Sequence, residues 1–168
     1  FSVANQKAFS FASAGESFEM LVIGDSLIWG QGLEEKYKLY TLTKNWLQSE
    51  LKKEVKLKVK AHSGATIFLH DKETELLQKG EMPETTIFHP EVPVSFPTLK
   101  TQIDAAKIEY QTLEKVDLVM LAGGLVDLTV AGILNPWGKD KILHDDIKKY
   151  CNDDMFRLLE YSTDVFPN

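Results

Sequence analysis

Three short apolar runs, each followed by glycine or small polar residues, divide the chain into regular segments. Phe18–Gly24 is an almost continuous apolar run that ends at a glycine, and Asp117–Ala122 is a second such run. Val55–Val59 instead alternates apolar residues with lysines. Runs of this length and pattern predict β-strands, and the two continuous runs are typical of strands that are buried on both faces.

Helical spacing of apolar residues accompanies these strands. It covers Lys36–Leu51, Leu99–Leu113 and Lys141–Tyr161, where apolar residues recur every three or four positions. Strands that alternate with helices in this way predict an α/β domain with a mainly parallel sheet. We therefore expect one domain over residues 1–168, in which residues 1–17 form an N-terminal extension.

The pattern supplies only three strands, and the last helical segment is followed by little more than Val165–Asn168. A parallel sheet of three strands would leave an unpaired edge, although such sheets are normally well covered. The sequence therefore predicts a domain that lacks its C-terminal strands. A longer form of the chain, a complementary C-terminal fragment or a second chain would complete the sheet.

Composition and charge exclude several classes of function. With 168 residues, 43% of them hydrophobic, the chain can bury a core, and its net charge of −6 argues against a nucleic-acid partner. No apolar run approaches the ~20 residues of a membrane span. Cys151 is the one cysteine, which excludes an intrachain disulfide. Neither metal-ligand spacing nor a glycine-rich phosphate loop is present in the sequence, so we expect no metal and no cofactor.

Polar residues follow each of the three apolar runs. Asp25 and Ser26 follow the first, His62 and Gly64 follow the second, and Asp127 follows the third. The carboxyl ends of parallel strands meet at one edge of a sheet, so we expect these residues to line one crevice. A serine there can act as a nucleophile if a base accepts its proton and N–H groups stabilise the oxyanion. It can equally be a residue that only caps a helix.

Three motifs at these positions resemble blocks of the GDSL/SGNH hydrolase family. Gly24–Leu27 reads Gly-Asp-Ser-Leu, Ala61–Thr66 resembles the second block, and Gly124–Asp127 lies where the third block reads Gly-x-Asn-Asp. The resemblance extends from Phe18 to the end of the chain. It implies a flavodoxin-like, three-layer α/β/α fold with a parallel sheet, and a serine esterase or lipase-like activity on carboxylic esters, whether small-molecule, lipid or carbohydrate.

The resemblance also implies a role for each matching residue. Ser26 would be the nucleophile, and the backbone N–H groups of Ser26 and Gly64 would donate to the oxyanion. Gly24 and Asp25 would shape the turn that presents the nucleophile. Asp127 would orient its loop by hydrogen bonding rather than transfer a proton.

Two features depart from the family pattern. Val126 stands where the family has an asparagine that donates to the oxyanion, and losing one such donor typically lowers the rate about 10²–10³-fold. The family's base is the histidine of a C-terminal Asp-x-x-His motif, and none of the four histidines lies in that motif: His62, His70, His89 and His144. We expect His62 to be a substrate contact or a hydrogen-bonded structural residue rather than a replacement base. The catalytic histidine is expected to come from a C-terminal segment or a second chain.

Two functions of different classes remain open at this point. The first is a serine hydrolase that is inactive as this chain alone and active when complete. The second is a hydrolase-fold binding or structural module that is catalytically impaired because Val126 replaces the asparagine. The proline-rich segment 81–97 is expected to line the cleft, with Phe88 and Phe96 either in its wall or in the core.

Overall fold

The computed structural model describes residues 17–70, 98–110, 116–128 and 143–166, together with residues 74, 75, 78, 79 and 137. The expectations for the proline-rich segment, with Phe88, Phe96 and His89, lie outside these residues. The expectation for residues 1–16 of the N-terminal extension also lies outside them.

A sheet of three parallel strands forms the centre of the described structure. Strand β1 (Phe18–Gly24) lies between β2 (Val55–Val59) and β3 (Leu118–Ala122), so the strand order is β2-β1-β3. The three strands are those that the sequence pattern predicts, with β3 beginning one residue later than expected. The predicted α/β class with a parallel sheet is therefore confirmed.

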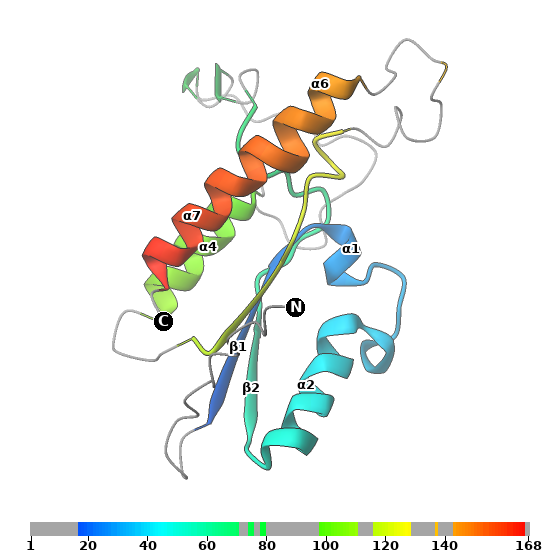
Figure 1. Ribbon diagram of the computed structural model, residues 1–168, viewed down its shortest axis with the longest axis vertical. Helices are drawn as coiled ribbons and strands as arrows, with labels where there is room; N and C mark the ends of the chain where they lie inside the picture. Colours follow the sequence, from blue (N-terminus) through cyan, green and yellow to red (C-terminus); the bar gives the residue numbers. More distant parts are fainter. Residues whose placement is uncertain are drawn as a thin grey trace, which may run out of the picture.

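The register of the strands brings their carboxyl ends to one edge of the sheet. Gly24, the last residue of β1, lies opposite Ala122, the last residue of β3, and Val22 lies opposite Val59 at the end of β2. Figure 1 shows the helix that follows β1 at this end of the sheet. The segments that follow the strands therefore start from neighbouring points.

One face of the sheet is covered by the helices between β1 and β2. They are α1 (Ser26–Trp29), the short 3₁₀ helix η1 (Glu35–Tyr37) and α2 (Leu39–Leu51). The helix predicted from Lys36 thus begins at Leu39, because the preceding residues form the separate turn η1. The core on this face contains these buried residues: Met20, Val22, Ile28, Tyr40, Val55 and Ala61.

The opposite face is covered by α4 (Leu99–Glu109) and by a long C-terminal helix (Figure 1). The C-terminal helix consists of α6 (His144–Asp146), a π-helical part η2 (Ile147–Asp154) and α7 (Met155–Val165). The core on this face contains these buried residues: Leu21, Ile23, Ala65, Ile67, Leu99, Ile103, Ala106, Tyr110, Val116 and Leu158. Helices thus lie on both faces of the sheet. Within the described part of the chain, no helix has the length and apolar character needed to cross a membrane.

Candidate functional site

The end of β1 is fixed by a side chain from α4. The N–H of Gly24 donates to Oε1 of Gln102 at 2.8 Å, and Nε2 of Gln102 donates to the Gly24 carbonyl at 2.9 Å. A Cβ atom at Gly24 would lie 2.3 Å from the carbonyl oxygen of Ala122 and 2.4 Å from a methyl group of Ile28. Glycine is therefore required at this position, and the residues after it leave the sheet from a fixed point.

Asp25 is buried and caps α1. Its Oδ1 accepts the N–H of Leu27 at 2.9 Å, while its Oδ2 has no hydrogen-bond partner among the described residues. Burial raises the pKa of Asp25; the hydrogen bond from Leu27 opposes this increase, and the negative charge of Asp127 adds to it. The N–H of Asp25 donates to the Ala122 carbonyl at 3.3 Å, so the residue after β1 lies directly beside the end of β3.

Ser26 is the first residue of α1 and is half-buried. Its backbone carbonyl accepts hydrogen bonds from the N–H groups of Gly30 and Gln31, both at 3.1 Å. The helix is capped by the side chain of Asp25 and not by the Ser26 hydroxyl. No hydrogen bond joins the hydroxyl to another residue in the described ranges.

The segment after β2 contains a buried histidine and an exposed glycine. The N–H of His62 donates to the Gly24 carbonyl at 2.9 Å, and Nδ1 of its ring donates to the Ser63 carbonyl at 2.8 Å. Gly64 has a φ of +79° and nothing lies within 4 Å of where its Cβ would be. This backbone conformation favours glycine, and the open space leaves its main chain accessible to a ligand.

The turn after β3 contains a buried carboxylate. Both oxygens of Asp127 lie 3.2 Å from the Ile67 nitrogen, whose N–H they accept, and Oδ1 lies 3.2 Å from Nε2 of His70. Its side chain is 1% exposed, whereas that of His70 is 38% exposed. Val126 is half-buried in the same turn and brings no polar side chain to it. Asp127 thus joins the turn after β3 to the loop after β2.

These contacts gather the residues that the sequence places after the three strands. We call the group the strand-exit cluster, and it consists of Asp25, Ser26, His62, Gly64 and Asp127. Within the described ranges, no three histidine, cysteine or acidic side chains are arranged to hold a metal ion. The cluster therefore offers a hydroxyl, exposed main chain and two buried carboxylates.

Two residues at this site were not anticipated from the sequence. Gln102 lies on a helix that was predicted only from its apolar positions, and His70 matches no motif. A buried glutamine in the first turns of an otherwise apolar helix face is a weak signal that its side chain hydrogen-bonds a neighbouring backbone. We call the pair of hydrogen bonds between Gln102 and the Gly24 backbone the Gln102 clamp. The pairing of His70 with Asp127 joins residues 57 positions apart and had no local signal.

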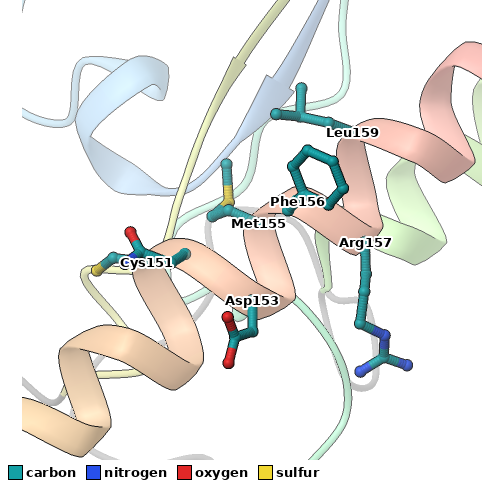
Figure 2. Close-up of a pocket in the computed structure, with 7 residues that line it drawn as sticks. Cys151, Asp153, Met155, Phe156, Arg157 and Leu159 are labelled. Carbon is teal, nitrogen blue, oxygen red and sulfur yellow. The ribbon is translucent and has the colours of Figure 1, made fainter.

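A cavity of about 600 Å³ lies along η2 and α7, and it is lined by Cys151, Asn152, Asp153, Met155, Phe156, Arg157 and Leu159 (Figure 2). None of the strand-exit cluster lines this cavity. Cys151 connects the two regions, because its Sγ lies 3.5 Å from where a Cβ of Gly124 would be. The C-terminal helix therefore packs against the backbone that leaves β3.

Comparisons of the chain with protein-family models, with curated proteins and with solved structures found no match. The resemblance to the GDSL/SGNH hydrolases therefore rests on the three short motifs, each of which lies where a strand ends.

Proposed function

We propose that this chain is the nucleophile-bearing part of a serine hydrolase that cleaves carboxylic esters. The observation that carries the proposal is the fixed position of Ser26, two residues after the backbone that Gln102 holds. The Gly24 carbonyl also accepts the N–H of His62, which lies two residues before the accessible main chain of Gly64. The hydroxyl of Ser26 and the main chain of Gly64, the proposed oxyanion donor, thus both follow closely on hydrogen bonds to the backbone of Gly24.

The strand order adds support to the proposed fold. The order β2-β1-β3 is the order of the first three strands in flavodoxin-like sheets, and ligands of such sheets bind at the carboxyl ends of the strands. We therefore propose the SGNH form of this three-layer fold. Its fourth and later strands would be added beside β3.

In the proposed reaction, Oγ of Ser26 attacks the carbonyl carbon of the ester while a histidine takes the hydroxyl proton. The N–H groups of Ser26 and Gly64 donate to the oxyanion of the tetrahedral intermediate. The histidine then returns its proton to the departing alcohol. Water attacks the acyl-enzyme with help from the same base, which releases the acid and restores Ser26.

The base is proposed to come from a polypeptide segment that carries Asp-x-x-His, either in a longer form of the chain or in a second chain. The contacts of the two described histidines near the strand ends support this. Nδ1 of His62 donates to the Ser63 carbonyl, and His70 is paired with Asp127. His144 is exposed at the start of α6.

Labelling with a fluorophosphonate probe tests the proposal directly. We expect the protein with its complementary segment, or this chain supplied with imidazole as an external base, to be modified at Ser26. Peptide mapping identifies the modified serine, Ser26→Ala should abolish labelling, and Ser49→Ala, at an exposed serine of α2, should not change it. Absence of modification at Ser26 with either source of base would exclude the hydrolase.

A second function is favoured by one specific residue. Val126 is half-buried at the position where the resemblance places the third oxyanion donor, so we also consider a binding module that has lost activity. The variant Val126→Asn distinguishes the serine hydrolase from the binding module. If the hydrolase is only weakened, the variant should gain on the order of 10²–10³-fold in the rate of Ser26 acylation. No acylation in either form would favour the binding module.

A further inference from the structure

The loop that follows β2, residues 61–70, is held by side chains from two distant parts of the chain. We call it the β2 exit loop; it carries Gly64. From the turn after β3, Asp127 accepts the Ile67 N–H with both oxygens at 3.2 Å and lies 3.2 Å from Nε2 of His70. Asp127 therefore contacts the loop at two residues, on the side of Gly64 that leads away from β2.

The C-terminal helix holds the same loop at two other points. The ring of Tyr150, in η2, stacks on the ring of His70 with centroids 5.7 Å apart and planes inclined by 24°. One to two turns later, the guanidinium of Arg157 lies 4.9 Å from the centre of the Phe68 ring. The π-helical part of the C-terminal helix thus carries the residue that touches His70.

The chemistry of the two side chains determines which one donates the hydrogen bond between His70 and Asp127. The Asp127 side chain is 1% exposed, and a buried carboxylate is costly unless hydrogen-bond donors surround it. A carboxylate oxygen accepts hydrogen bonds, so we assign the ring proton of His70 to Nε2 in this contact.

We propose that His70 is a positioning residue for the β2 exit loop. Its Nε2–H donates to Asp127 and keeps the carboxylate directed at the Ile67 N–H, and the Tyr150 ring holds the imidazole in that orientation. Through these contacts His70 fixes the loop backbone from which Gly64 presents its N–H. The inference goes beyond the proposed hydrolase, because the loop is held in this way whether or not Ser26 reacts.

Amide hydrogen exchange measured by NMR tests this role without any substrate. His70→Ala should raise the exchange rate of the Ile67 amide by about tenfold or more, since the carboxylate loses a donor and the loop opens locally. His70→Gln should restore part of the protection, because its terminal amide can place a donor where Nε2 lies. His144→Ala, at an exposed histidine of α6, is the matched control and should leave Ile67 unchanged.

Tyr150→Leu provides a second variant that keeps Asp127 and His70. It should give an intermediate increase in Ile67 exchange, because the stacked ring is lost while the donor remains. Unchanged Ile67 exchange in folded His70→Ala, or equal loss of protection in His70→Ala and His70→Gln, would overturn the proposal. If His70→Ala does not fold, the Ile67 exchange rates of Tyr150→Leu and His70→Gln test the proposal. Wild-type exchange rates in both variants would then overturn it.

Ser26 labelling in the same variants keeps this proposal separate from the proposed function. If Ser26 is acylated, His70→Ala should lower the maximal rate more than it weakens probe binding, and His70→Gln should recover part of it. If no variant is labelled, the hydrolase proposal fails, whereas the Ile67 exchange rates still decide the role of His70.

Discussion

The backbone of Gly24 makes three hydrogen bonds at the point where β1 ends, and two of them come from the side chain of Gln102. Gln102→Leu should lower the free energy of unfolding by roughly 1–3 kcal/mol, because the buried Gly24 N–H loses its acceptor. Urea denaturation measures the change. Gln31→Ala, at an exposed glutamine, should leave the midpoint unchanged; a similar effect in both variants would contradict the clamp.

The buried carboxylate of Asp25 gives a pH-dependent prediction. Its pKa is raised by burial and by Asp127 despite the Leu27 hydrogen bond, so the folded chain binds this proton more tightly than the unfolded chain. The free energy of unfolding therefore falls as the pH rises from the unfolded pKa, about 3.9, through the folded pKa. Asn caps helices as well as Asp does, so Asp25→Asn should be more stable than the wild type at pH 7.

The advantage of Asp25→Asn should shrink as the pH is lowered toward about 3.9, because the wild-type carboxyl then becomes neutral. Urea denaturation at a series of pH values measures this difference. Asp25→Ala is the control that loses the cap as well as the charge, and it should be less stable than Asp25→Asn throughout. A constant difference between wild type and Asp25→Asn across the pH range would contradict the explanation.

At the scale of single elements, apolar periodicity predicts that a helix exists more reliably than it predicts which face is buried. In α2, the apolar residues Leu39, Leu42 and Trp46 share one side, yet they are 57%, 51% and 61% exposed. Tyr40 is the buried residue, at 2% exposure, and Leu47 packs against the same core. α2 thus has two apolar sides, and the position of the strands determines which side is buried.

The same distinction applies to the candidate site. The ends of the apolar runs locate Asp25, Ser26, His62, Gly64 and Asp127 correctly at one edge of the sheet, because that information is local. The contacts that hold them are not local. The clamp on Gly24 spans 78 positions, and the pairing of His70 with Asp127 spans 57. Such contacts depend on strand register and helix packing, which no short motif in the sequence reveals.

For the whole molecule, β1 is the element that joins the two cores. Its residues alternate in direction: Met20 and Val22 belong to the core beneath α2, whereas Leu21 and Ile23 belong to the core beneath α4 and the C-terminal helix. All four are fully buried. Loss of packing on one face destabilises β1, and β1 also contributes side chains to the core on the other face. We therefore expect the two layers to unfold together.

Ile103 of α4 allows this coupling to be tested from the opposite face of the sheet. It is fully buried, and Ile103→Ala should lower the free energy of unfolding by about 2–5 kcal/mol. Ile108→Ala, at a 66% exposed position of the same helix, should change it by no more than about 0.5 kcal/mol. Trp29 and Trp46 lie on the α2 side, and the third tryptophan, Trp137, is 91% exposed. The change in tryptophan fluorescence on unfolding therefore reports mainly on the layer that the mutation does not touch. The fluorescence and far-UV circular dichroism midpoints in urea should shift together, and a fluorescence midpoint that stays at the wild-type value would show that the two cores are independent.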